Sequence, residues 1–202
     1  MSDSLARAQL ARAANGLKAR ARNRLPALVL MTDDERLRDP LAAARALPRG
    51  SMVVVRTRDR ARLETFSGAM LRIARTGGLA VVVASDPELA AHLGAAGFHL
   101  PETRMDEAAY WHSRFPSLLI TTSAHSLSAL LLAQPMPVDA VFLSPVFATR
   151  SHPGRTALTP MRANLLAKQM RRPLYALGGI GAHNATLLHG FAGIAAISAL
   201  AI

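Results

Sequence analysis

The stretch from Pro173 to Leu200, PLYALGGIGAHNATLLHGFAGIAAISAL, decides the fold. It contains two short apolar runs that are typical of buried strands. The first run ends in Gly178-Gly179 and the second ends in Ile197-Ser198. Backbone N–H groups at glycine turns and helix N-termini bind phosphate well, because small residues let the anion approach the chain. Two successive strands with such ends resemble the paired phosphate site of the seventh and eighth strands in a β/α barrel.

The chain upstream of this stretch, from Pro26 on, alternates short apolar runs with longer segments of helical spacing. This alternation is the signature of repeated β/α units. Eight strands are predicted, over residues 27–31, 52–56, 79–84, 97–100, 117–122, 140–143, 173–177 and 193–198. Seven helices are predicted between them, near residues 39–47, 59–76, 86–95, 105–112, 126–134, 159–170 and 182–189. Near-continuous valine runs favour parallel strands buried on both faces. We therefore expect a closed (β/α)8 TIM barrel, with an open doubly wound sheet as the alternative.

The last predicted strand is followed by only four residues after Ser198, so the sequence offers no eighth helix to cover it. An extra helix is instead expected at the other end of the chain. The predicted organisation is an N-terminal basic helix in residues 1–24, followed by a β/α barrel in residues 25–202.

Residues 4–22 predict this N-terminal helix, which carries several arginines and an apolar stripe of Leu5, Leu10 and Leu17. Asn15-Gly16 is a candidate interruption. We expect the helix to pack beside strands one and eight, in or near the place of the missing helix, with its arginines facing solvent. An Arg-rich, acid-poor N-terminus is also a feature of organellar transit peptides, which is the alternative interpretation.

The composition describes a folded protein with one large core, since 50% of the 202 residues are apolar and 18% are charged. No apolar run is long enough to span a bilayer, and the absence of cysteine excludes a disulfide framework and thiolate chemistry. A soluble, cytoplasmic protein is expected.

The formal net charge of +11 attracts polyanions or phosphorylated small molecules. Nucleic-acid binding is not expected, because aromatics make up only 4% of the chain.

Groups at the C-terminal ends of barrel strands converge on one mouth, which makes the strand ends the places to search for chemistry. Arg56 and Arg58 follow the second strand, and planar guanidinium groups there suit a diphosphate. The alternative is that both are loop arginines bonded to Asp59 or solvent. Ser123 and His125 follow the fifth strand, where a neutral imidazole can exchange a proton near pH 7. Their alternative roles are a helix cap and a side chain packed over the first helical turn.

The loop after the sixth strand supplies further donors, namely Thr149, Ser151 and His152, between prolines that stiffen it. Such a loop suits a phosphate cover. The other strand ends carry weaker signals. Asp33 is as compatible with a helix cap as with a ligand contact, and His99 is interpreted as structural rather than catalytic.

These motifs together resemble the thiamine phosphate synthase and thiazole tautomerase family of β/α barrels. The resemblance runs from about Leu28 to Ala201. Its specific parts are LVLMTD, GAAGFHL, TTSAHSL, SPVFATRSHPG, ALGGI and AAISAL, which begin at Leu28, Gly94, Thr121, Ser144, Ala176 and Ala195.

The resemblance implies that a hydroxymethylpyrimidine diphosphate loses diphosphate and that a thiazole phosphate captures the resulting cation. It also implies that Arg56 contacts the diphosphate, with Arg58 where the family usually has Lys, and that Ser123 touches the pyrimidine diphosphate. The thiazole phosphate would be held by Thr149, Ser151, Gly179, Ile197 and Ser198, with Gly178 and His152 in the same two loops. The tautomerase relative uses a histidine that matches His125 as its proton carrier.

The family also uses Mg²⁺, a hard cation that needs oxygen ligands. Ser85 and Arg104 stand at the positions where the resemblance places its two carboxylate ligands, so no metal ligand is assigned here. Asp86 and Glu102 are the nearest carboxylates that could substitute.

The predicted function is that of a thiamine phosphate synthase-like transferase of thiamine biosynthesis. Thiazole tautomerase activity, which is an isomerase reaction, or binding of a phosphorylated ligand without catalysis are the alternatives. The expected partners are a phosphorylated thiazole and a pyrimidine diphosphate, with neither nucleic acid nor a membrane. A homo-oligomer is compatible with the sequence.

Overall fold

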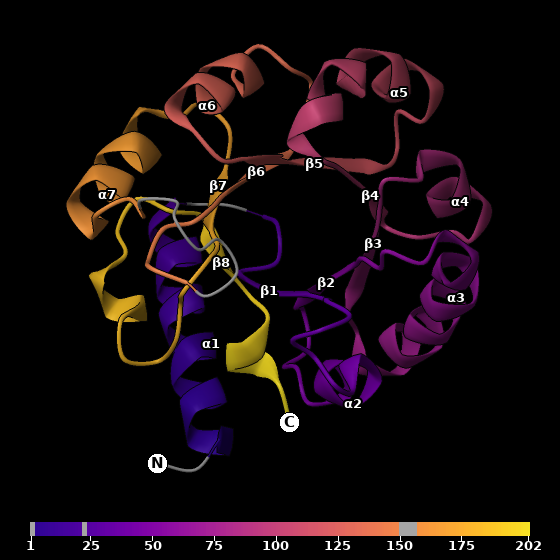
Figure 1. Cartoon of the computed structure of the whole chain (residues 1–202), viewed down its shortest axis with the longest axis horizontal. Helices are drawn as coiled ribbons and strands as arrows, with labels where there is room; N and C mark the ends of the chain where they lie inside the picture. Colours follow the sequence, from indigo (N-terminus) through magenta and orange to yellow (C-terminus); the bar gives the residue numbers. More distant parts are fainter. Residues whose placement is uncertain (1–2, 22–23, 150–156) are drawn as a thin grey trace.

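The protein, represented by a computed structural model, is described over residues 3–21, 24–149 and 157–202. Eight parallel strands form a closed barrel in chain order, in which the last strand pairs with the first (Figure 1). The strands are β1 (Leu28–Met31), β2 (Met52–Val55), β3 (Ala80–Ala84), β4 (Gly97–Leu100), β5 (Leu119–Ala124), β6 (Ala140–Leu143), β7 (Leu174–Ala176) and β8 (Gly193–Ala196). The closed barrel is thus confirmed, and the open sheet is excluded by the pairing of Val29 with both Met52 and Ala195.

The outer ring of the barrel consists of α-helices that follow the strands (Figure 1). They are α2 (Pro40–Arg45), α3 (Arg60–Gly77), α4 (Pro87–His92), α5 (Ala108–Arg114), α6 (Leu127–Ala133) and α7 (Pro160–Gln169), with α1 (Asp3–Ala21) preceding the barrel. Short 3-10 segments are η1 (Glu102–Glu107), η2 (Ala185–Leu187) and η3 (Ser198–Leu200). Side-chain oxygens cap several helix starts, as Asp59 does by accepting a hydrogen bond from the N–H of Arg62.

Two of the predicted helices differ from the structure. The helix expected near 105–112 is divided into η1 and α5, with non-helical backbone angles at Arg104. The prediction of a helix at 182–189 is wrong, because only the 3-10 segment η2 forms there. The Asn184 side chain accepts from the N–H of Gly181 and donates to the carbonyl of Gly179, so it closes a local loop before any helix begins.

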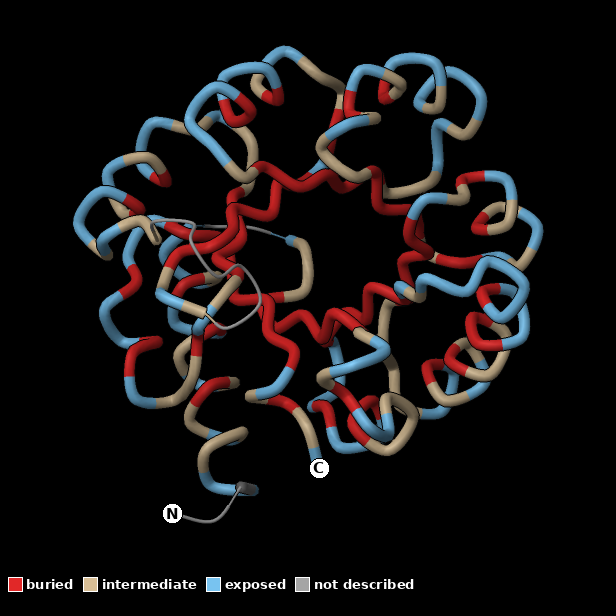
Figure 2. Tube along the Cα trace, viewed as in Figure 1, coloured by how far each residue is buried: buried red, intermediate tan, exposed pale blue. Residues whose placement is uncertain are grey.

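The barrel wall is buried on both faces, as Figure 2 shows by the continuous red ring of strands. Val53, Val54 and Val55 are each 0% exposed, which agrees with the expectation for an all-parallel sheet covered by helices.

The N-terminal helix α1 packs against β8, β1 and the short segments η2 and η3, in the part of the outer ring between α7 and α2 (Figure 1). Leu10 and Leu17 are buried at 1% and 3% exposure. Leu5 was expected in the same stripe but is 46% exposed, because it lies near the start of the helix, beyond the apolar contact.

Two other expectations for α1 are corrected by its geometry. The helix continues through Asn15-Gly16 without a break. Arg7 does not simply face solvent, since its guanidinium donates to the carbonyl of Ala201 at 2.9 Å and so ties the helix to the C-terminal segment. Within the described parts of the chain, no helix is both long and apolar enough to cross a membrane.

Candidate active site

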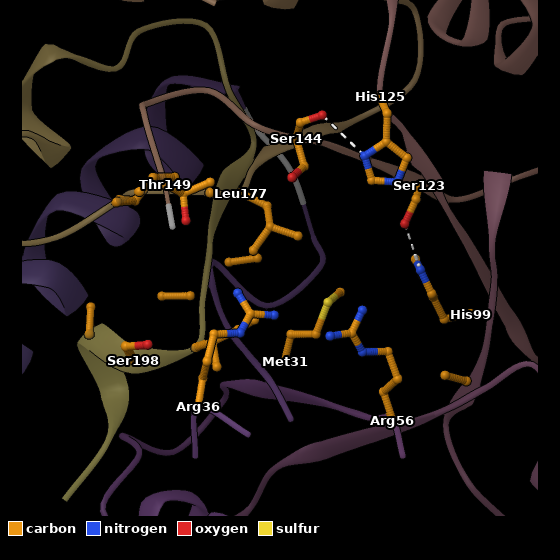
Figure 3. A pocket seen from close by; sticks show the side chains of 18 of the residues that line it. Met31, Arg36, Arg56, His99, Ser123, His125, Ser144, Thr149, Leu177 and Ser198 are labelled. Atoms are coloured by element: carbon orange, nitrogen blue, oxygen red, sulfur yellow. Dashed lines mark hydrogen bonds between the residues drawn. The ribbon is translucent and has the colours of Figure 1, made fainter. Parts of the chain in front are cut away.

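The C-terminal ends of the strands surround a pocket of about 670 Å³, which we call the mouth pocket. This volume lies within the range of small-molecule sites. Its walls come from loops after several strands, so residues far apart in the sequence face one space (Figure 3). Of the predicted site residues, those that line it are Arg56, Ser123, His125, Thr149, Gly178, Gly179, Ile197 and Ser198.

The Gly178-Gly179 turn after β7 brings bare backbone to the pocket. Both residues have positive φ, 93° and 65°. A Cβ at Gly178 would lie 2.9 Å from the Cα of Pro145, and one at Gly179 would lie 2.5 Å from the carbonyl oxygen of Ala148. Both the backbone angles and the close packing therefore require glycine.

The N–H groups of Gly178, Gly179 and Ser198 are the polar groups of this wall. None of the hydrogen bonds formed between described residues uses these three N–H donors. Ser198 follows β8, the strand hydrogen-bonded to β7, so the donors belong to neighbouring loops of one mouth. Donors of this kind, beside small residues, suit a phosphate group. Thr149 lines the same pocket, whereas Ser151 and His152 lie outside the described residues.

A carboxylate between two arginines forms another wall. Asp33 accepts from Arg36 at 2.6 Å and from Arg56 at 2.5 Å, and both guanidinium groups line the mouth pocket (Figure 3). Burial alone would raise the pKa of the Asp33 carboxyl, but hydrogen bonds from Arg36 and the charges of both arginines hold it well below its usual range. The carboxylate is thus ionised, and the wall carries a net positive charge.

Arg36 was not predicted as a site residue. The available signal was its spacing of three residues from Asp33, which allows the bidentate contact, but an isolated Asp-x-x-Arg spacing is common on solvated surfaces.

Arg58 and Arg104 take positions outside the lining of the mouth pocket. The Arg58 guanidinium pairs with Glu35 at 2.6 Å and its side chain is 82% exposed, so its contact with a diphosphate stays a prediction. Arg104 pairs with Glu107 and donates to the carbonyl of Ser85.

His99 lines the mouth pocket from inside the barrel and is only 5% exposed. Burial lowers its pKa to about 3, and the nearby positive charges of Arg56 and His125 act in the same direction, so the ring is neutral. Its Nδ1 is 2.9 Å from the Thr121 hydroxyl and its Nε2 is 2.9 Å from the Ser123 hydroxyl. Because Thr121 donates its proton to the carbonyl of Phe98, Nδ1–H donates to Thr121 and Nε2 accepts from Ser123.

This chain of hydrogen bonds determines what Ser123 offers to a ligand. Since the hydroxyl proton of Ser123 points to His99, its oxygen lone pairs are the groups left for the pocket. Ser123 is therefore an acceptor that suits an amino group of a ligand.

His125 follows β5 and is oriented by two neighbours. Its backbone N–H donates to the Glu102 carboxylate at 2.6 Å, and its Nδ1 lies 3.1 Å from the carbonyl oxygen of Ser144 (Figure 3). A carbonyl can only accept, so Nδ1 carries a proton and Nε2 is the nitrogen that can gain or lose the second one. The arrangement suits a proton acceptor in the pocket.

The carboxylates near the pocket are each engaged by other groups of the protein, which does not favour a magnesium site. Within the described ranges no cluster of three or more His, Asp or Glu side chains could hold a metal ion. Asp86 caps α4 through the N–H of Leu89, Glu102 accepts from His125, and Asp33 is shared by two arginines. We therefore derive no step through a metal.

The fold and the mouth pocket define a β/α barrel with a small-molecule pocket whose lining suits phosphate. Comparison with known proteins gives the family. The thiamine monophosphate synthase family profile matches residues 28–200, and the chain belongs to this family.

Curated relatives cover most of the chain. It is 30% identical to the thiamine-phosphate synthase of Chlamydia caviae, with 85% of each protein covered. It is 31% identical to that of Chlorobium luteolum, over 87% of this chain and 85% of the relative. Among solved structures, thiamine phosphate pyrophosphorylase from Pyrococcus furiosus has a TM-score of 0.69 at 22% identity over 85% of each chain, which supports the barrel fold. The family assignment supports an enzyme role in thiamine biosynthesis.

Proposed function

We propose that the protein joins a hydroxymethylpyrimidine diphosphate to a thiazole phosphate and releases diphosphate. The observation that carries this proposal is the pair of anion-binding walls in one pocket. One wall presents the N–H groups of Gly178, Gly179 and Ser198, and the other presents Arg36 and Arg56. Two walls suit two substrates that each bear phosphate.

The chemistry requires positioning and charge stabilisation. The bond between the pyrimidine methylene carbon and the diphosphate oxygen breaks, with its electron pair leaving on the diphosphate. The thiazole nitrogen then donates its lone pair to the methylene cation. Guanidinium groups stabilise the negative charge that develops on the leaving oxygen, because they are already oriented before the reaction. Arg56 would act in this way, and the proposal is supported by the contact with Asp33 that holds its guanidinium at the edge of the pocket.

The other groups of the pocket orient the two partners. The glycine turn and Ser198 would hold the thiazole phosphate, with Thr149 beside them. The Ser123 oxygen would accept from the amino group of the pyrimidine. Alignment of two reactants in one pocket lowers the entropic part of the barrier.

A turnover assay with both substrates tests this proposal. Arg56→Ala should lower kcat/KM by about 10²-fold or more, the usual effect of removing a charge-stabilising donor. Arg75→Ala is the matched control, because this arginine is exposed on α3, lies outside the described lining of the pocket and should change turnover little. Equal losses in the two variants, or no turnover by the parent protein, would count against the synthase proposal.

Thiazole tautomerase activity is the second candidate, and the orientation of His125 favours it. With Nδ1–H directed to the Ser144 carbonyl, Nε2 is the nitrogen that could move a proton on a thiazole phosphate. His125→Ala should lower a tautomerase rate by about 10²- to 10⁴-fold while ligand affinity changes little. Unchanged proton exchange in the variant would remove this candidate.

Binding without catalysis is the third candidate. Like the other two, it uses the wall formed by the N–H groups of Gly178, Gly179 and Ser198. Ser198→Asp places a carboxylate against that wall and should abolish thiazole-phosphate binding, measured by titration calorimetry. Unchanged affinity would contradict the placement of the phosphate at Ser198.

A further inference from the structure

A second cavity lies at the opposite end of the barrel from the mouth pocket. Its volume is about 670 Å³, and we call it the basal cavity. Leu174 begins β7, Ala192 immediately precedes β8 and Asp139 precedes β6, so the cavity lies beneath the N-terminal ends of these strands.

Five cationic side chains line the basal cavity, and they come from separate parts of the chain. Arg20 belongs to the end of α1, Arg24 precedes β1, and the others lie in or just after α7. These are Lys168, Arg171 and Arg172.

None of these five cations is paired with a carboxylate in the described parts of the chain. The six ion pairs found there involve other arginines. Asp139 is the only acidic residue in the described lining, and its carboxylate accepts a hydrogen bond from the backbone N–H of Ile120. Like charges gathered around one cavity repel each other unless an anion lies among them.

The remaining lining indicates the size and type of anion. Leu25, Met170 and Leu174 give the cavity an apolar part beside the charges, and no aromatic side chain is among the described lining residues. Single-stranded nucleic acids are held by aromatic stacking platforms, which this cavity lacks. A volume of this size matches a small organic molecule.

We propose that the basal cavity binds a small anion containing a diphosphate group, either free or as an ester. The guanidinium forks of Arg171 and Arg172 would donate to the phosphate oxygens, with Arg20, Arg24 and Lys168 adding positive charge around them. The site is separate from the mouth pocket and does not depend on the synthase activity.

Backbone amide signals can distinguish the two sites in solution, because Gly190 and Ala192 line the basal cavity whereas Gly178 and Gly179 line the mouth pocket. The experiment is a titration of the ¹⁵N-labelled protein with inorganic diphosphate and, separately, with ADP at low salt without added metal. We expect saturable shifts at Gly190 and Ala192 with both probes. Tighter binding of ADP would indicate an ester as the occupant, and equal or weaker binding would indicate the free anion.

Matched variants test which cations are responsible. Arg171→Ala with Arg172→Ala should weaken the binding seen at the basal amides by about tenfold or more, which is the effect of losing one charge-assisted contact. Arg72→Ala with Arg75→Ala removes the same charge from the exposed face of α3 and should leave that affinity unchanged. Arg56→Ala alters the mouth pocket and should also leave the affinity at the basal amides unchanged. A loss of binding at the mouth pocket can therefore be distinguished from a loss at the basal cavity.

The proposal is overturned if the basal amides do not shift, or if both double variants weaken binding equally. It is also overturned if single-stranded RNA saturates the basal amides at lower concentration than either probe. Loss of the dispersed amide signals would show that the Arg171→Ala and Arg172→Ala variant does not fold. In that case Arg20→Ala with Lys168→Ala is compared with the control variant instead, since both of these side chains are exposed.

Discussion

Asp33 is the residue on which the charged wall of the mouth pocket depends. Its side chain is 11% exposed and contacts two guanidinium groups that are 32% and 44% exposed. This largely covered carboxylate orients both arginines, and both of them line the pocket. The pair is thus oriented before any ligand arrives.

Arg36 provides the first prediction at this scale. Arg36→Ala should weaken binding of the hydroxymethylpyrimidine diphosphate by about tenfold, because one charge-assisted hydrogen bond is lost. Arg38→Ala, an exposed neighbour, should bind as the parent does. Titration calorimetry checks both, and equal affinities for the Arg36 variant and the parent would show that this arginine only neutralises Asp33.

His99 provides a prediction about pH. Its pKa is about 3 in the folded protein and about 6.5 in an unfolded chain, so the unfolded state binds the proton first as pH falls. The free energy of unfolding should therefore be unaffected by this group above pH 6.5 and decrease between pH 6.5 and 3, by up to about 1.4 kcal/mol per pH unit.

His99→Gln removes this titration while keeping a polar side chain for the Ser123 and Thr121 hydroxyls. Urea unfolding at several pH values should show the parent losing stability relative to the variant as pH falls through that window. A difference between the two proteins that is constant with pH would contradict the prediction.

Among the elements, α1 has the clearest role in stability. It lies outside the barrel wall where β8 is not followed by an α-helix within the described residues, and its contact face consists of Leu10, Ala14 and Leu17. The helix propensity of α1 alone would not keep it folded against the barrel, because most helical stability in proteins comes from packing of an apolar face.

Leu10→Ala tests this contact. Leu10 is 1% exposed, so the substitution should lower the free energy of unfolding by about 2–5 kcal/mol. Leu5→Ala is the matched control on the same helix, and its 46% exposure predicts a small effect. Thermal and urea unfolding monitor both. Equal stability of the two variants would show that α1 is a dispensable tail.

At the scale of the whole molecule, the barrel and α1 share one core cluster, which includes Leu10, Leu28 and Ile194. We predict that α1 unfolds together with the barrel, although the sequence predicts them as separate segments. Trp111, the single tryptophan, lies on α5 and is a probe remote from α1.

The test compares Trp111 fluorescence with far-UV circular dichroism during thermal unfolding of the parent and of Leu10→Ala. Both probes should give one midpoint, and the variant should shift both by the same amount, since coincident transitions are the mark of two-state unfolding. A shift seen only by circular dichroism would indicate that α1 unfolds independently.

The sequence by itself determined the number and order of the strands and favoured the closed barrel over an open sheet. These features depend on local patterns. Valine runs predict buried parallel strands, and Gly178-Gly179 predicts a turn that other residues cannot adopt. The helix predicted at 182–189 was wrong because side-chain bonding by Asn184 competes with helix formation, and apolar spacing does not report such competition.

Only the tertiary structure decided which polar groups meet. Asp33 contacts Arg56 across 23 residues of sequence, and that contact exists because β1 and β2 pair in a particular register. The pairing of β4 with β5 places His99 beside Ser123, so that the oxygen of this hydroxyl, not its proton, is left for a ligand. Periodicity encodes burial along one element, whereas charges and hydrogen bonds between elements depend on register and barrel closure, which no local pattern contains.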